Sequence, residues 1–337
     1  MANDAIRTMV ADRSAASKGL YPIDLAVADY DRTRPIIDGR VKPEGIALRT
    51  ETGWIGDFCT RPVYEQYDAA EMSLSWYVAA RCRGEPVVAL PIFPLRMPVL
   101  AYVLTRRDAP YFEPKDLKGK RIGAPLYRLT VNLWLRGIFR DHYGLAPEDV
   151  TWVTCETEGV AGYVVPPGIK LEAAKGGTPE ELLERGAVDA ILVPQLPQSF
   201  LAGTSNMRRL FRDAQAEMRG FVQRTGIYPI THTLVMKAEL AKREPWIAES
   251  LFHAFAKAQR TWQEFIFADS KHLSLPDAVF ILEQQRAAYG ENAWPQGLGP
   301  NRKVLETFLR YAHTQGYISR PMAVEELFPE NTLGLQA

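Results

Sequence analysis

Short apolar runs alternate along this chain with longer segments in which apolar and polar residues are mixed. The apolar runs are rich in branched aliphatic side chains and stop at charged or turn-forming residues, which is the pattern of strands buried within a sheet. They cover residues 23–27, 46–49, 87–90, 101–105, 121–124, 188–193 and 227–236. Their alternation with helical segments predicts an α/β protein whose sheets are mainly parallel and flanked by helices.

The helical segments are recognised by periodicity and by their first residues. Apolar residues between Ile247 and Phe265 recur about every 3.6 residues, which predicts a long amphipathic helix that begins near Pro245. Thr130 is the expected N-cap of a helix over residues 131–139. Residues 178–181 match a capping box with proline at the first helical position, so another helix is expected to follow them.

The length of the chain predicts two lobes. Its 337 residues exceed what a single hydrophobic core usually contains. Residues 1–104 and 232–337 are expected to form the first lobe, and residues 105–231 the second, each built on a mainly parallel sheet. The two lobes would form a clamshell that closes on a small ligand in the cleft between them.

Composition and charge limit the kinds of molecule that the protein is expected to bind. The chain is 47% hydrophobic and 24% charged, as in ordinary globular proteins, and its 40 basic and 40 acidic residues cancel. This balance argues against nucleic acid or a membrane surface as the main partner. Cys59, Cys82 and Cys155 match neither a disulfide framework nor metal-binding spacing, and the N-terminal segment lacks the apolar centre of a secretory signal. Both observations favour the cytoplasm.

The end of the first predicted strand is the favoured place for chemistry. In open α/β sheets, ligands bind outside the carboxyl ends of the strands. Here the strand runs into a loop with Asp29, Asp31, Arg32 and Arg34, and the two arginines can grip a carboxylate through their planar forks. A solvated turn with local ion pairs is the alternative interpretation.

Other predicted loops supply further candidates for binding a carboxylate: Arg96, Tyr127, Arg128 and Thr130. Thr130 would act together with the exposed N–H groups at the start of its helix, which attract anions. Ser73 and Ser75 lie at another predicted turn and would either donate hydroxyl groups to the ligand or cap a helix.

His232 is the candidate for proton transfer, with a hydrogen-bonded histidine inside a core strand as the alternative. Asp31 and Glu71 would either orient the arginines or pair with His232 to set its tautomer, although structural ion pairing also explains both acids. The chain lacks the HExxH, GxGxxG, GxxxxGK[ST] and GxSxG patterns, so we predict neither a metal site nor a cofactor. A divalent ion held by Asp31, Glu71 and His232 is the alternative.

The chain also resembles known proteins in several motifs. Residues 116–123 and 186–191 resemble the type II periplasmic-binding-protein fold. Four further segments resemble 4,5-dihydroxyphthalate decarboxylases, a cytoplasmic enzyme branch of that fold: residues 29–35 with 38–45, 71–75, 134–137 and 224–233. The resemblance extends roughly from Tyr21 to Glu264. Met97, Leu126 and Arg128 depart from the family pattern, so the expected substrate is a 4,5-dihydroxyphthalate-like acid whose identity stays open.

This resemblance implies a carboxy-lyase of aromatic catabolism that works without a cofactor on a hydroxylated aromatic carboxylic acid such as a phthalate or hydroxybenzoate. Arginines would hold the carboxylate, and His232 or an acid would protonate the ipso carbon in a closed cleft. The alternatives are a non-catalytic solute-binding or sensing protein for a small carboxylate, and an enzyme of pyrimidine or cofactor-precursor synthesis. A homo-oligomer is compatible with either activity.

Overall fold

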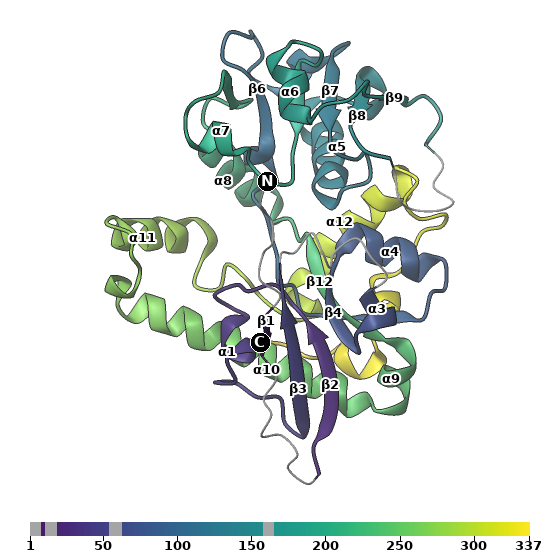
Figure 1. Cartoon of the computed structure of the whole chain (residues 1–337), viewed down its shortest axis with the longest axis vertical. Helices are drawn as coiled ribbons and strands as arrows, with labels where there is room; N and C mark the ends of the chain where they lie inside the picture. The colour runs from purple at the N-terminus through teal and green to yellow at the C-terminus, as the bar shows by residue number, and fades with distance from the viewer. Residues whose placement is uncertain (1–7, 11–18, 54–62, 158–164) are drawn as a thin grey trace. The chain divides into compact units, whose positions relative to one another are not determined.

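The computed structural model describes residues 8–10, 19–53, 63–157 and 165–337 (Figure 1). The chain divides into two compact units. Unit 1 comprises Met1–Arg96, Ile230–Glu306 and Met322–Ala337, and unit 2 comprises Met97–Pro229 and Thr307–Pro321. The segment Thr307–Pro321, which the sequence placed in the first lobe, thus belongs to unit 2. The reason is aromatic packing, because Phe308 and Tyr311 contact the buried ring of Trp134.

Unit 1 is built on a sheet with the strand order β1-β3-β2-β4-β12-β5. The strands are β1 (Thr8–Val10), β2 (Tyr21–Ala26), β3 (Ile46–Thr52), β4 (Ala69–Ser73), β5 (Val87–Leu90) and β12 (His232–Lys237). β2 runs parallel to β3 and to β4, whereas β12 runs antiparallel to both of its neighbours, and β1 antiparallel to β3. The apolar runs of the sequence therefore do form neighbouring buried strands.

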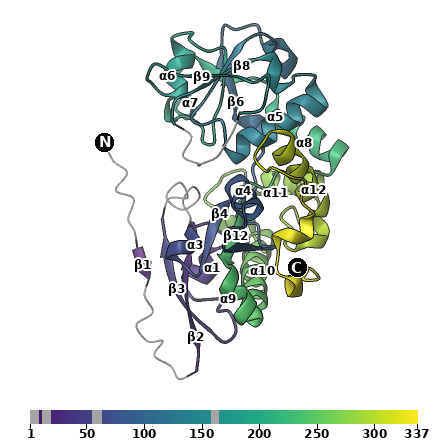
Figure 2. The same cartoon turned by 90° about the vertical axis from the view of Figure 1, so that its right-hand side faces the viewer.

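Unit 1 also contains helices. They are α1 (Arg34–Ile37), α3 (Val63–Gln66), α4 (Leu74–Cys82), α9 (Ala238–Arg243), α10 (Pro245–Ala268), α11 (Ala278–Tyr289) and the first half of α12 (Leu298–Thr314), with 3-10 turns at Ser270–His272, Val324–Leu327 and Glu330–Thr332. α10 packs along one face of the sheet (Figure 2), where Leu251 and Phe255 meet Leu25 and Leu234 in one core. The apolar face of α10 stays buried only as far as Gln259, and Phe265 is 43% exposed.

Unit 2 has a second sheet, with the order β11-β6-β10-β7-β8-β9. Its strands are β6 (Val103–Arg106), β7 (Arg121–Ala124), β8 (Thr151–Thr154), β9 (Lys170–Ala173), β10 (Ala190–Leu192) and β11 (Met207–Arg209). Its helices are α5 (Thr130–Tyr143), α6 (Pro179–Glu184), α7 (Gln198–Leu201), α8 (Ala214–Thr225) and the second half of α12, with 3-10 turns at Val99–Tyr102, Pro114–Leu117 and Pro147–Asp149.

Both sheets are mixed. In unit 2, β10, β7, β8 and β9 run parallel, while β6 is antiparallel to β10 and to β11. β6 and β12 are the strands that the chain enters shortly after it passes from one unit to the other. These crossing strands bring antiparallel pairs into each sheet, and β1 adds another in unit 1, so the unit 1 sheet is not mainly parallel as predicted.

The predicted helix starts have different outcomes. The capping box is confirmed: the Glu181 N–H donates to Thr178 Oγ1 at 3.3 Å, and the Thr178 N–H donates to Glu181 Oε2 at 2.9 Å. The cap at Thr130 is wrong by one residue, because Leu129 takes the extended N-cap conformation and Thr130 is already helical. No helix within the described ranges is long and apolar enough to cross a membrane.

Candidate active site

Glu71 and His232 form a buried acid–histidine pair in unit 1. β4 and β12 run side by side with His232 opposite Ser73, so Glu71, two residues earlier, is its diagonal neighbour on the same face of the sheet. His232 Nδ1 lies 2.7 Å from Glu71 Oε1. The Glu71 side chain is fully buried, and that of His232 is 10% exposed. His232 therefore pairs with a fully buried carboxylate, while a small part of its own side chain is exposed.

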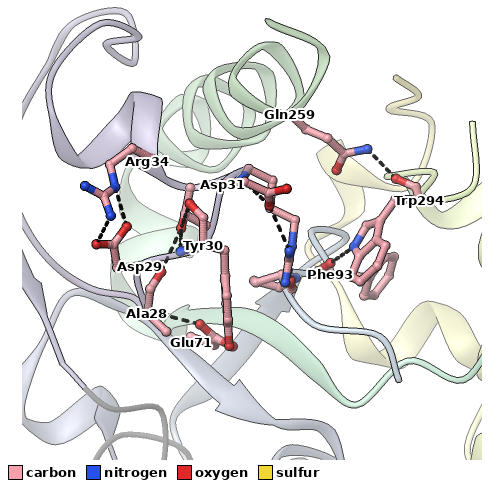
Figure 3. Close-up of polar contacts among 12 residues, drawn as sticks. Ala28, Asp29, Tyr30, Asp31, Arg34, Glu71, Phe93, Gln259 and Trp294 are labelled. Carbon is pink, nitrogen blue, oxygen red and sulfur yellow. Dashed lines mark hydrogen bonds and ion pairs between the residues drawn. The ribbon is translucent and has the colours of Figure 1, made fainter. Parts of the chain in front are cut away.

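Two further groups donate hydrogen bonds to the Glu71 carboxylate (Figure 3). The Ala28 N–H donates to Oε2 at 3.2 Å, and the Tyr30 hydroxyl donates to Oε1 at 3.0 Å. A buried carboxylate requires such donors, since an unpaired charge in a protein interior is costly. His232 contacts Glu71 through Nδ1, so Nε2 is the ring nitrogen that faces away from the carboxylate.

Arg32 lies between two aromatic rings of the same unit. Its Cζ is 4.1 Å from the ring centre of Tyr30 and 4.4 Å from that of Trp294. Its Nε donates to the carbonyl oxygen of Pro94, and its Nη1 pairs with Asp31 at 3.0 Å. Only 16% of the side chain is exposed. Stacking and hydrogen bonds together fix the plane of the guanidinium group.

Trp294 is itself held in place from two directions (Figure 3). Its indole N–H donates to the Phe93 carbonyl oxygen at 2.9 Å, and its own carbonyl accepts a hydrogen bond from the Gln259 amide on α10. Trp294, one of the two rings that flank Arg32, is thus hydrogen-bonded to α10. No motif or periodicity in the sequence marks Trp294.

The other predicted arginines of unit 1 have different surroundings. Arg34 forms an ion pair with Asp29, with Nε 2.5 Å from Oδ1, and its side chain is 54% exposed (Figure 3). Arg96 is buried, and its Nη2 donates to the Pro295 carbonyl at 2.7 Å and to the Asn301 amide oxygen. Arg96 therefore attaches the loop that follows Trp294 to the sheet.

Asp31 and the two serines complete the predicted set in unit 1. Asp31 was expected to pair with either an arginine or His232. It pairs with Arg32, whereas Glu71 contacts His232. Ser73 occupies the N-cap position of α4, but its side chain makes no capping hydrogen bond there. Ser73 and Ser75 are both buried.

The remaining candidates lie in unit 2. Tyr127, Arg128 and Thr130 are all buried before or at the start of α5. Arg128 has its guanidinium carbon 5.1 Å from the ring centre of Tyr317. The buried Arg136, which the sequence analysis did not single out, donates to the Tyr127 carbonyl at 2.9 Å and to the Tyr317 hydroxyl at 2.7 Å. It thereby fixes the loop that carries Arg128.

Two curated proteins are similar in sequence to this chain. The chain is 32% identical over 319 residues to a 4,5-dihydroxyphthalate decarboxylase of Comamonas testosteroni, which covers 91% of this chain and 96% of that protein. It belongs to the 4,5-dihydroxyphthalate decarboxylase family. A Pseudomonas putida decarboxylase of the same name is 34% identical over 203 residues, 57% of this chain and 78% of that protein. The predicted family and enzyme class, a carboxy-lyase, are confirmed. No protein-family model matches the chain.

Solved structures confirm the fold of this decarboxylase-family chain. The periplasmic aliphatic sulphonate binding protein SsuA of Escherichia coli aligns over 92% of both chains with a TM-score of 0.53 at 11% identity. A sulfonate-binding SsuA from Methylobacillus flagellatus aligns over 94% of this chain and 93% of its own, with a TM-score of 0.57 at 13% identity. The periplasmic-binding-protein-like α/β fold expected from the sequence is thus confirmed.

The described acids, histidines and cysteines of this family member were compared with the needs of a metal site and of a cysteine nucleophile. Among the residues described, no three His, Cys, Asp or Glu side chains are grouped as metal ligands, so Asp31, Glu71 and His232 do not form such a set. Neither Cys82 nor Cys155 is part of a disulfide among the described residues, and Cys59 lies outside them. Burial raises the pKa of the Cys155 thiol, and the nearby carboxylates of Glu180 and Glu156 raise it further. Cys155 is therefore a poor nucleophile.

Proposed function

We propose that this chain removes CO₂ from a hydroxylated aromatic carboxylic acid of the 4,5-dihydroxyphthalate type. The observation that carries the proposal is the buried Glu71–His232 pair, which shares Tyr30 with the stacked Arg32. A proton donor and a rigid carboxylate receptor are the two groups that this reaction needs most. The names of the curated relatives support the same substrate class.

The reaction can be followed through its bonds. A proton first binds to the ring carbon that carries the carboxylate, and the ring hydroxyl opposite this carbon supplies electron density as it loses its own proton. The bond between that carbon and the carboxylate then breaks, CO₂ leaves, and the electron pair of the bond restores the aromatic ring. Protonated His232 gives this proton from Nε2 while Glu71 holds Nδ1–H, and solvent afterwards restores the proton to the imidazole. A general acid in this position contributes a rate factor of about 10²–10⁴.

Arg32 is the proposed receptor for a substrate carboxylate. Its plane is fixed by Tyr30 and Trp294, and its Nη2 makes no hydrogen bond to any described residue. Asp31 would orient it. The other proposed ligand contacts are Arg34, Ser73, Ser75 and Arg96 in unit 1 and Tyr127, Arg128 and Thr130 in unit 2. We place the reaction in the cytoplasm and without a cofactor; neither Cys82 nor Cys155 is part of a disulfide within the described part of the chain, which suits a reducing compartment.

The role of Arg32 leads to a quantitative expectation. Replacing Arg32 with alanine should raise KM for the aromatic acid about tenfold or more, because a planar, pre-oriented carboxylate contact is lost. Arg40, just after α1, offers a matched control, since it forms an exposed ion pair with Asp38 and its side chain is 53% exposed. Arg40→Ala should change KM by less than about twofold. Steady-state kinetics of both variants measure this, and equal KM values would contradict the assignment.

The proposed activity is tested with a panel of acids. Purified protein is incubated with 4,5-dihydroxyphthalate, phthalate and hydroxybenzoates, and CO₂ release and thermal unfolding are recorded together. We expect CO₂ release from at least one hydroxylated acid. A solute-binding protein would instead be stabilised by an acid that is recovered unchanged, because ligand binding to the native state alone raises stability. That result would overturn the proposal.

A further inference from the structure

Tyr30 touches both parts of the candidate site. Its hydroxyl donates to Glu71 Oε1 at 3.0 Å, the same oxygen atom that lies 2.7 Å from His232 Nδ1. Its ring centre lies 4.1 Å from the guanidinium carbon of Arg32 (Figure 3). Tyr30 therefore contacts Glu71, the partner of His232, through its hydroxyl group, and it contacts Arg32 through its ring.

The position of Tyr30 is set by its own backbone. The Tyr30 N–H donates to Thr33 Oγ1 at 2.9 Å, and the Thr33 hydroxyl donates to the Ala28 carbonyl at 2.7 Å. The Arg34 N–H closes the turn with a 2.8 Å hydrogen bond to the Tyr30 carbonyl. Thr33 is 1% exposed, so these bonds are shielded from water. A hydrogen-bonded turn therefore holds the backbone from which the Tyr30 phenol extends.

We propose that Tyr30 is a positioning residue that aligns the acid–histidine pair and the arginine with each other. The inference rests on the proposed decarboxylase function. The phenol hydroxyl holds the Glu71 carboxylate so that Oε1 faces His232, and the ring holds the Arg32 guanidinium in the plane that receives a carboxylate. The two contacts are separable, because phenylalanine removes the first and keeps the second.

Another tyrosine of unit 1 provides the control. The Tyr67 hydroxyl donates to Glu51 Oε2 at 2.7 Å, so it makes the same kind of tyrosine–carboxylate bond. Neither residue contacts Arg32 or His232 in the described contacts. Tyr67→Phe therefore reports what such a bond contributes to stability alone, without any effect on the reacting groups.

The experiment compares kcat and KM of the wild type with Tyr30→Phe, Tyr30→Leu and Tyr67→Phe. In Tyr30→Phe, kcat should fall about tenfold, the size of one hydrogen bond to a charged group, while KM stays within about twofold. Tyr30→Leu should lower kcat equally and raise KM about fivefold, because the stacked ring is lost as well. Tyr67→Phe should leave both constants at wild-type values.

The outcomes separate the two proposals. A wild-type protein without turnover overturns the proposed function, and with it the role of Tyr30. A wild type that turns over together with a Tyr30→Phe variant of unchanged kcat overturns the role of Tyr30 alone. A kcat loss shared equally by Tyr30→Phe and Tyr67→Phe would show a general structural effect and would also refute it. If Tyr30→Leu fails to fold, the two phenylalanine variants still decide.

Discussion

Replacing His232 with glutamine is expected to lower kcat by about 10²–10⁴-fold, because the variant has no group that can give a proton to the ring carbon. Glutamine keeps a side chain of similar length that can still donate a hydrogen bond to Glu71. Far-UV circular dichroism and the unfolding midpoint should therefore stay close to those of the wild type, and the loss should appear in kcat rather than in KM.

A second histidine provides the comparison for this variant. His253 is exposed on α10, where its ring packs against Phe252. His253→Gln should retain wild-type kcat, since the residue has no contact with Glu71, Tyr30 or Arg32 in the described contacts. Steady-state assays of the two variants under the same conditions measure the difference. Equal activities would remove His232 from the proton-transfer step.

The largest expected effect on stability comes from Gly137, inside α5. A Cβ atom added at this position would overlap the ring of Tyr311, which packs against the helix and also contacts Trp134. Gly→Ala within a helix ordinarily stabilises it by about 1 kcal/mol. Here the overlap should dominate, so Gly137→Ala should lower the free energy of unfolding by about 1–3 kcal/mol.

Gly220 in α8 is the matched control for this substitution. The nearest atom to an added Cβ is the end of the Arg224 side chain, 3.0 Å away, and this flexible group can move. Gly220→Ala should therefore leave stability unchanged or raise it by up to about 1 kcal/mol. Urea unfolding of both variants measures the difference. A Gly137→Ala variant as stable as Gly220→Ala would contradict the close packing of α5 against Tyr311.

The sequence predicted the members of the acid–histidine pair but not their pairing. The apolar run around His232 indicated a strand, and the resemblance drew attention to both residues. Which of Asp31 and Glu71 would meet His232 stayed open. That choice depends on the register of β4 against β12, and the two residues are 161 positions apart in the chain. Strand register over such a distance is set by tertiary packing.

The stacking of Arg32 between Tyr30 and Trp294 could also be predicted only in part from the sequence. Arg32 was found because it follows a buried strand, and Tyr30 lies in the same turn. Trp294 comes from a loop near the start of α12, where neither periodicity nor a motif marks it. Its role depends on hydrogen bonds to Phe93 and Gln259, which belong to other segments of unit 1.

Agreement with the predicted elements differs along the chain, and burial alone does not explain it, because the buried strands β4 and β8 were not among the predicted runs. β7 was predicted with its observed bounds, and α10 began at the expected proline. β9 was missed because its residues are mostly exposed and polar, so they give no apolar run. The assignment of Thr307–Pro321 to unit 2 depends on the contacts of Phe308 and Tyr311 with Trp134, and the helical pattern of α12 does not reveal it.

The central claim is that this chain breaks a carbon–carbon bond and that His232 supplies the proton. The most direct measurement follows 4,5-dihydroxyphthalate, CO₂ and 3,4-dihydroxybenzoate together, for the wild type and for His232→Gln. We predict that the wild type forms the two products in equal amounts as substrate disappears, and that the variant does so about 10²–10⁴-fold more slowly. Binding of the acid without either product, or an undiminished rate in the variant, would contradict the claim.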